Sequence, residues 1–257
     1  MQHLQHHKRL GLAGSIVVVT PHAAESLMQS RGIRRAVQRR ELVLLQWDDG
    51  LEPRASHFMQ IPANNLLRLA AWGSSIRLGF WDLDEYLVLP RHNSIQQEMH
   101  TGCLKGVLSA MPEAIIPSTW VSAPSWDAGA ELHGWMAYGH WAAAVQAMGY
   151  VGWNYAFCSG VCKVLVDPNT DMLFQVHGHA RTPRDVGPSK EVPRSCAYLL
   201  HFYQLWQLRQ PELMKRVAGS PGTPLQIGEV LPAMVQRMAE LPAAPAATPD
   251  SSRAAGL

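Results

Sequence analysis

Short apolar runs alternate with amphipathic segments over the first third of the chain. The apolar runs are rich in β-branched residues and too short for helices, which is typical of buried strands. The amphipathic segments repeat their apolar residues at helical spacing. We expect strands over residues 15–20, 42–47 and 77–81, and helices over residues 4–10, 23–29 and 64–72. Strands that alternate with helices in this way predict an α/β fold with a mostly parallel sheet flanked by helices.

The last of these helices, over residues 64–72, has a predicted face and a predicted end. Gly73 follows it directly and is expected to cap its C-terminus, because glycine readily adopts the left-handed conformation that ends helices. The expected apolar face is formed by Leu66, Leu67, Ala70 and Ala71.

The second half of the chain is less regular. Residues 125–139 are rich in Gly and Trp and predict a long loop, and three prolines predict another over 181–193. We expect a strand over 115–121, a hairpin of 161–166 with 172–176, and helices over 141–148, 195–209 and 225–241. The predicted domains are an α/β domain over 1–210, a helical extension over 211–241 and a disordered Ala/Pro/Ser-rich tail over 242–257.

Three carboxylates follow the strand expected over residues 77–81: Asp82, Asp84 and Glu85. Burying charges is costly unless they are paired or bound to a cation. Side chains two residues apart in extended backbone share one face, so Asp82 and Asp84 suit a divalent cation with oxygen ligands. In α/β sheets, ligands bind at the carboxyl ends of strands. The alternative is an acidic turn without a ligand.

Histidines and amides provide further candidates. His177 and His179 alternate along an expected extended stretch, so one of them could complete a metal site; the alternative is one loop histidine and one core histidine. His201 is interpreted as structural. The amides of Gln60 and Asn64 could hydrogen-bond a base or a sugar, or could simply belong to the polar face of a helix start.

Charge and cysteine content narrow the class of protein. The net charge is +2, which gives no electrostatic argument for nucleic acid or for a membrane surface. The chain is too large to depend on disulfides, so its four cysteines indicate buried thiols or one secretory-pathway disulfide. Cys158 and Cys162, without a second such pair, are only a weak zinc pattern.

Two runs of the sequence stand out together, Q-I-P-A-N-N at 60–65 and W-D-L-D-E-Y-L at 81–87. Three further runs follow, K-V-L-V-D-P at 163–168, V-H at 176–177 and L-H-F-Y at 200–203. Together they resemble glycosyltransferase family 92, whose members have the GT-A fold; the likeness is strongest in the first two runs and looser in the others. The resemblance implies a GT-A-like, Rossmann-like sheet with an irregular acceptor-side second half.

The resemblance implies an inverting, metal-dependent transfer of a sugar from a nucleotide sugar, expected to be a UDP-sugar, to a glycan acceptor. It makes Asp82 and Asp84 ligands of Mn²⁺ or Mg²⁺, with His177 as the third ligand. Gln60 and Asn64, together with Asp82, would serve the donor site, and Glu85 would support either the motif or the donor sugar. An inverting enzyme also needs a carboxylate base, for which Asp127 and Glu131 are candidates by location.

The resemblance also bears on the context of the chain. It implies the lumenal side of the Golgi or of another secretory-pathway membrane, with membrane association only through an anchor that this chain lacks. The family's first strand would lie before Met1, so we expect the chain to be a truncated member.

Two other functions fit parts of the pattern. An apolar strand followed by D-x-D also describes haloacid-dehalogenase-type phosphatases, although these want Thr or Val where Tyr86 stands. A non-catalytic carbohydrate-binding domain with a degenerate donor site is the third possibility.

Overall fold

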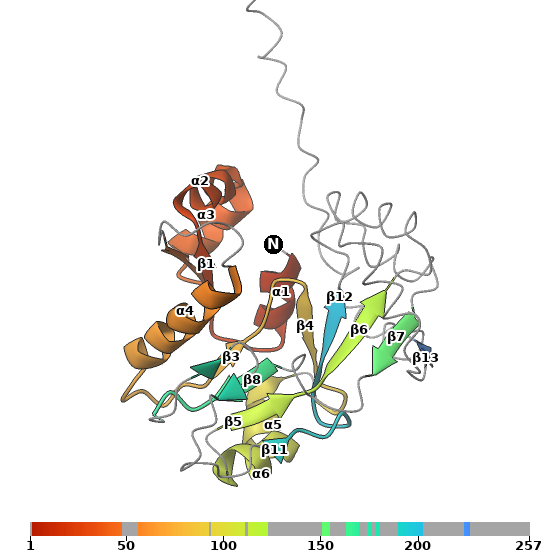
Figure 1. Cartoon of the computed structure of the whole chain (residues 1–257). Coiled ribbons are helices and arrows are strands. Elements are labelled where there is room, and N and C mark those ends of the chain that lie inside the picture. Colours follow the sequence, from red (N-terminus) through yellow and green to blue (C-terminus); the bar gives the residue numbers. More distant parts are fainter. Residues whose placement is uncertain are drawn as a thin grey trace, which may run out of the picture. The chain divides into compact units, whose positions relative to one another are not determined.

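The computed structural model describes ten stretches of the chain, drawn in colour in Figure 1. The chain divides into two compact units, one of Met1–Trp120 with Asn154–Phe202 and one of Val121–Trp153 with Tyr203–Leu257. The acidic turn lies in the first unit. The described residues are 2–47, 56–92, 94–110, 113–122, 151–154, 163–169, 174–175, 178–179, 190–202 and 224–226.

The first unit begins with a helix and a strand–helix–strand segment. Helix α1 (Gln2–Arg9) precedes strand β1 (Ser15–Val19), which pairs in parallel with β2 (Leu42–Gln46). Helices α2 (Pro21–Gln29) and α3 (Arg31–Gln38) connect the two strands. The predicted parallel pair is confirmed.

The strand pair is less buried than its composition predicted. Ile16 and Val43 lie opposite each other in the register and are 46% and 49% exposed. The covered face packs in a small core around Leu4, Ala36 and Leu42. Each strand therefore has a more covered and a more exposed face, although the residues of both strands are mostly apolar.

Helix α4 (Ser56–Ala70) begins earlier than predicted and turns another face to the core. Leu66 is 46% exposed, while Ala63 and Arg68 are buried, so the predicted apolar face is wrong. Arg68 lies over the Trp72 ring, 5.5 Å from its centroid. A guanidinium can stack on an aromatic face, which lets a charged residue occupy this position. Gly73 has a φ of 81°, the left-handed conformation predicted for the end of this helix.

Strand β3 (Leu78–Phe80) does not join the parallel pair. It lies at the edge of a four-stranded sheet of order β11-β5-β8-β3, with β5 (Glu113–Ile116), β8 (Lys163–Val166) and β11 (Lys190–Glu191). Strand β8 is antiparallel to both β3 and β5, and β11 is parallel to β5. Most pairings among the described strands are antiparallel, so the mostly parallel sheet was wrong. Apolar runs identify strands but not their partners.

Strand β4 (Glu85–Val88) follows the acidic turn and pairs antiparallel with β12 (Tyr198–Phe202). The helix predicted over 195–209 is therefore wrong at β12, because a continuous apolar run fits a buried strand and a buried helix equally well. The strand predicted over 115–121 is divided at Pro117 into β5 and β6 (Ser118–Ser122). Proline lacks the N–H that a ladder needs.

Helices α5 (Ile95–His100) and α6 (Cys103–Ala110) complete the first unit. A disulfide between Cys103 and Cys196 joins the start of α6 to the turn before β12, and a disulfide is one of the two states expected for the cysteines. The largest core contains apolar side chains from β4, α6, β5, β8 and β12, including Leu87, Leu89, Leu104, Val107, Ile116, Leu165 and Leu199. This core holds β4, the strand after the acidic turn, whereas Leu78 and Phe80 of β3 pack in a separate cluster against Val164 and Val166.

The remaining strands are short. Strand β9 (Phe174–Gln175) pairs with β10 (Gly178–His179), so the predicted hairpin of 161–166 with 172–176 is wrong. In the second unit, β7 (Val151–Asn154) pairs antiparallel with β13 (Pro224–Gln226), where a helix over 225–241 was predicted. The helix predicted over 141–148, the loop over 125–139 and the tail over 242–257 lie outside the described residues. In the described part of the chain, no helix combines the length and apolar character needed to cross a membrane.

Gly79 on β3 has a packing role that can be tested. A Cβ at this position would lie 2.0 Å from the Trp81 ring, so Gly79→Ala must displace the indole. We expect a loss of about 1–3 kcal/mol in the free energy of unfolding, measured by urea denaturation. Gly106→Ala on α6 is the control, because its Cβ would meet nothing within 4 Å. That change should be neutral or stabilising by up to about 1 kcal/mol, and equal losses at both positions would contradict the assignment.

Candidate functional site

The acidic turn, residues 81–85, connects β3 to β4 and is closed by two reciprocal hydrogen bonds. The Glu85 N–H donates to the Asp82 carbonyl over 3.1 Å, and the Asp82 N–H donates to Glu85 Oε2 over 2.7 Å. One side chain thus ties both ends of the turn. Glu85 is in this respect a structural member of the motif, which agrees with one of its two expected roles.

The three carboxylates of the turn differ sharply in exposure. The Asp82 side chain is 40% exposed, that of Asp84 is 6% exposed, and that of Glu85 is fully buried. A ligand from solvent can therefore contact Asp82 directly. Glu85 cannot contact a ligand without a change in the turn.

Lys163, the first residue of β8, places a positive charge beside the carboxylates of Asp82 and Glu85. Its Nζ lies 2.8 Å from Asp82 Oδ2 and 3.7 Å from Glu85 Oε2. The register explains this position, because Phe80 at the end of β3 lies opposite Val164. Burial acts to lower the pKa of Lys163, but the charges of Glu85 and Asp82 outweigh it and raise that pKa. Lys163 therefore remains a cation at neutral pH.

His201 on β12 lies against the two buried carboxylates. Its Nδ1 is 3.5 Å from Glu85 Oε1 and its Nε2 is 3.5 Å from Asp84 Oδ2. It lies opposite Glu85 in the β4–β12 register. Burial raises the pKa of Glu85 to about 7, although Lys163 and His201 act to lower it. Glu85 therefore exchanges a proton near neutral pH.

Three histidines of α1 bind the backbone of β4. His3 Nε2 donates to the Glu85 carbonyl over 3.0 Å, and His6 Nε2 donates to the Leu87 carbonyl over 2.7 Å. The Leu87 N–H donates to His7 Nε2 over 3.2 Å, which leaves His7 Nδ1 to donate to the His3 carbonyl over 3.0 Å. A neutral imidazole has one donor and one acceptor nitrogen, as this arrangement needs. Figure 1 shows α1 beside β4, which is an edge strand among the strands that the structure describes, and the three histidines bond its backbone there.

The other predicted site residues are not all within the described chain. Gln60 and Asn64 lie half-exposed on α4, and Asn65 Nδ2 donates to the Ile61 carbonyl within that helix. His177, Asp127 and Glu131 lie outside the described residues. The structure therefore brings together Asp82, Asp84 and Glu85, and adds Lys163 and His201.

The two added residues had weak signals in the sequence. Lys163 is a single cation at the start of an otherwise apolar run, and such a lysine needs a carboxylate partner if the run is buried. His201 lies within an apolar run and was interpreted as structural. Only the strand pairings show that both residues are next to the acidic turn.

The acidic turn offers carboxylate oxygens, which are suitable ligand atoms for a divalent cation. Mn²⁺ and Mg²⁺ prefer carboxylate oxygens, and one or two carboxylates suffice where a substrate supplies phosphates. Asp82 presents its carboxylate to solvent, whereas Asp84 is directed to His201. Among the described residues, only Glu98, Cys103 and Cys196 place three metal-ligand atoms within 4.8 Å of one another. That group is a disulfide beside a glutamate and is not a manganese site.

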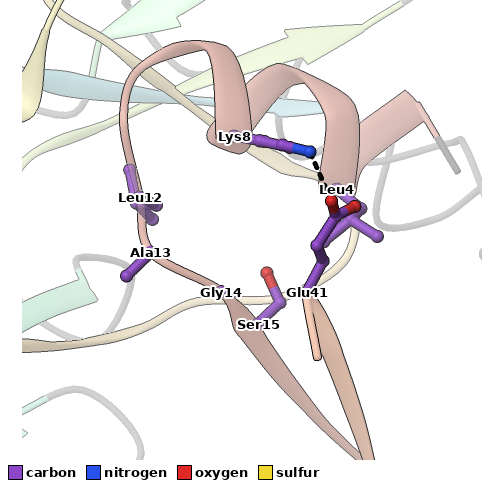
Figure 2. Close-up of a pocket in the computed structure, with 7 residues that line it drawn as sticks. All are labelled: Leu4, Lys8, Leu12, Ala13, Gly14, Ser15 and Glu41. Atoms are coloured by element: carbon purple, nitrogen blue, oxygen red, sulfur yellow. Dashed lines mark hydrogen bonds and ion pairs between the residues drawn. The ribbon is translucent and has the colours of Figure 1, made fainter. Parts of the chain in front are cut away.

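A small cavity lies elsewhere in the first unit, between α1 and the start of β1 (Figure 2). Its volume of about 10 Å³ holds about one water molecule. Lys8 Nζ lies 2.5 Å from Glu41 Oε1 at its rim. The cavity is too small for a nucleotide or a sugar, so the acidic turn remains the candidate site.

Comparison with known proteins adds no relative: no protein-family model and no curated protein matches this chain.

Proposed function

We propose that this protein transfers a sugar from a nucleotide sugar to a glycan acceptor, with inversion and with a divalent metal ion, as its resemblance to glycosyltransferase family 92 implies. The observation that carries the proposal is the unequal exposure of the acidic turn. Asp82 faces solvent while Asp84, Glu85 and Lys163 are buried behind it. Burying charged groups costs stability even when they are paired. A turn that only connects two strands does not need them.

The GT-A assignment of the fold is part of the same proposal. It is supported by the parallel β1–β2 pair with its connecting helices. The acidic turn follows the carboxyl end of β3, an antiparallel edge strand, and presents Asp82 to solvent. The donor and the acceptor are therefore assigned to this end of the first unit.

The carboxylates of the turn and several residues outside it have proposed roles in this activity. Asp82 and Asp84 would hold Mn²⁺ or Mg²⁺, with His177 as third ligand, and the ion would neutralise the departing diphosphate. Glu85 holds the turn through the Asp82 N–H, and Lys163 orients the Asp82 carboxylate. Asp127 or Glu131 would deprotonate the acceptor hydroxyl. The lumen of the Golgi is the proposed location, again from the family resemblance.

Calorimetric titration of the full chain with UDP and UDP-sugars, with and without Mn²⁺, tests this function. We expect binding that requires Mn²⁺ and is weakened at least about tenfold in Asp82→Asn, because one charged ligand is lost. Asp167→Asn is the matched control, since Asp167 also pairs with a cation, Arg77, over 2.7 Å but lies away from the acidic turn. Its UDP affinity should equal that of the unchanged protein.

The alternatives give different results in the same protein. Turnover of an aryl phosphate that is lost in Asp82→Asn would support the phosphatase and contradict the transferase. Binding of glycans that ignores both Mn²⁺ and UDP would favour a non-catalytic carbohydrate-binding domain. Metal-independent UDP binding unaffected by Asp82→Asn would also contradict the proposal.

A further inference from the structure

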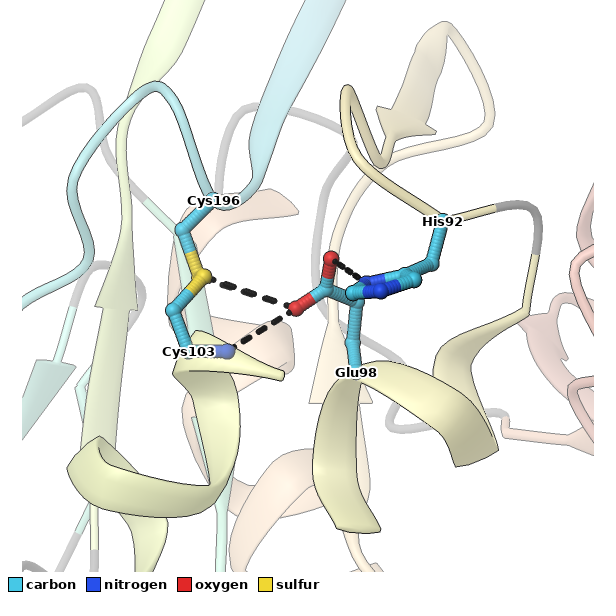
Figure 3. Close-up of a disulfide and its surroundings, with 4 residues drawn as sticks. All are labelled: His92, Glu98, Cys103 and Cys196. Atoms are coloured by element: carbon cyan, nitrogen blue, oxygen red, sulfur yellow. Dashed lines mark hydrogen bonds and ion pairs between the residues drawn. A yellow bond between two sulfur atoms is a disulfide. The ribbon is translucent and has the colours of Figure 1, made fainter. Parts of the chain in front are cut away.

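A second group of ligand-type side chains lies in the core of the first unit, away from the acidic turn. Glu98 on α5 faces Cys103 at the start of α6 and Cys196 before β12 (Figure 3). The two cysteines form the disulfide, with their Cα atoms 5.9 Å apart. Glu98 and Cys196 are fully buried. A buried carboxylate against two sulfurs is an unusual neighbour for a structural disulfide.

The Glu98 carboxylate is held in place on both of its oxygens. Its Oε2 accepts the Cys103 N–H over 3.2 Å, and its Oε1 lies 2.5 Å from His92 Nδ1. A Cβ at Gly102 would lie 2.2 Å from Oε2, so the space for this carboxylate depends on a glycine. The side chain is therefore fixed in its direction toward the sulfurs.

In the disulfide, the two sulfurs do not act as hydrogen-bond donors to the Glu98 carboxylate. Glu98 Oε2 lies 3.4 Å from Cys103 Sγ and 4.0 Å from Cys196 Sγ. Disulfide sulfurs carry no hydrogen, so they cannot donate to the carboxylate. Reduction would convert the same atoms into thiols that can donate, or into thiolates that can bind a metal.

We propose that, when the disulfide is reduced, Cys103, Cys196 and Glu98 bind a thiophilic divalent cation such as Zn²⁺. The three ligand atoms already lie within 4.8 Å of one another. Zn–S bonds of about 2.3 Å and Zn–O bonds of about 2.0 Å in a tetrahedron separate sulfur and oxygen by about 3.5 Å. The distances of 3.4 and 4.0 Å from Oε2 to the sulfurs are close to this value.

A neighbouring histidine and the type of the ligands both favour Zn²⁺ at this site. His92 Nδ1 holds the second oxygen of Glu98, as outer partners commonly orient a ligating carboxylate. Two thiolates favour Zn²⁺ over Mn²⁺ or Mg²⁺, which prefer oxygen. This site does not rest on the proposed transferase function, and the two can fail separately.

The chemistry balances with a phosphine as reductant. The phosphine gives two electrons to the disulfide and becomes a phosphine oxide with oxygen from water; the S–S bond breaks and two thiols take up two protons. Zn²⁺ then replaces both thiol protons and is bound as a dithiolate. Because two protons are released, the affinity should rise with pH.

Titration of the phosphine-reduced full chain with Co²⁺, followed by displacement with Zn²⁺, tests the site. We use a background in which Cys158 and Cys162 are replaced by serine, so that thiolate ligation reports on Cys103 and Cys196. We expect one Co²⁺ per chain with a thiolate charge-transfer band, and none without reductant. Cys103→Ser with Cys196→Ser should abolish the band, and Glu98→Gln should weaken binding about 10–100-fold.

One control variant and one folding measurement accompany the Co²⁺ titration. Glu113→Gln removes another buried carboxylate, outside the three-ligand group, and should leave Co²⁺ affinity unchanged. If the reduced chain unfolds without metal, Zn²⁺ should restore a cooperative thermal transition. Absence of the band from the folded reduced chain, failure of Zn²⁺ to restore folding, a band that survives loss of both cysteines, or full affinity in Glu98→Gln would overturn the proposal.

Discussion

Replacing Lys163 by methionine is expected to lower the free energy of unfolding by about 3 kcal/mol near pH 9, because the Glu85 carboxylate, which is ionised there in the unchanged protein, loses its buried cation. Lys163 is 4% exposed and lies against both Asp82 and Glu85. Methionine keeps the length of the side chain, so the loss reports on charge rather than on a cavity. Urea denaturation measures it.

The electrostatic cause predicts a specific rescue. Glu85→Gln in the Lys163→Met background should recover a large part of the loss, because glutamine keeps an acceptor for the Asp82 N–H without a charge. Without Lys163, the pKa of Glu85 should rise above its present value of about 7, since the lysine acts to lower it. The variant should then go on losing stability as the pH rises above 7, because the folded chain still holds a proton there that the unfolded chain has released.

Arg77→Met supplies the matched control. Arg77 also lies beside β3 and pairs with an aspartate after β8, Asp167, but both side chains are about one quarter exposed. Partly exposed pairs contribute about 0–1 kcal/mol. A loss in Arg77→Met as large as that in Lys163→Met would contradict the role assigned to burial, as would a failure of Glu85→Gln to rescue.

Local features of the sequence predicted several elements of the fold. The parallel pair of β1 and β2, helix α2 and the left-handed Gly73 all follow from short-range patterns of apolar residues and glycine. The pairing of β3 with β8 and of β4 with β12 joins segments about 80 to 110 residues apart, and apolar runs carry no information on such partners. The predicted helix at 195–209 failed for the same reason.

The candidate site was predictable to a similar degree. Three carboxylates after an apolar strand identified the acidic turn, and Glu85 was expected to support it. The sequence did not indicate that Asp82 alone among the three carboxylates would be exposed. Exposure depends on which side chains of other strands pack against the turn. Lys163 and His201 reach it only through the strand registers. The histidines of α1 were missed because their bonds to β4 join residues 80 to 82 positions apart, and no local spacing indicates such partners.

The stability of the first unit is expected to fall as the pH is lowered from about 6.5 toward 4, because α1 binds β4 through neutral imidazoles. Burial lowers the pKa of His3 from 6.5 to about 4 and lowers the pKa of His7 well below 6.5. In this window the unfolded chain binds protons that the folded chain does not, so protons favour unfolding. His3 alone accounts for about 3 kcal/mol by pH 4.

Glu85 has the opposite effect on stability as the pH falls, which gives a second variant for testing the prediction. Its pKa is raised by burial from 4.5 to about 7, so the folded chain binds its proton first and gains stability as the pH falls from 7 to 4.5. It offsets part of the effect of the two histidines, so the net loss is smaller than that of the histidines alone. Glu85→Gln should therefore steepen the loss.

Urea denaturation from pH 7 to pH 4 measures the profile. His7→Gln removes one titrating ring but keeps a donor and an acceptor toward His3 and Leu87, so its profile should be flatter than that of the unchanged protein. His22→Gln, an exposed position on α2, should leave the profile unchanged. Equal slopes in His7→Gln and His22→Gln would show that the docking of α1 through neutral histidines does not control acid stability.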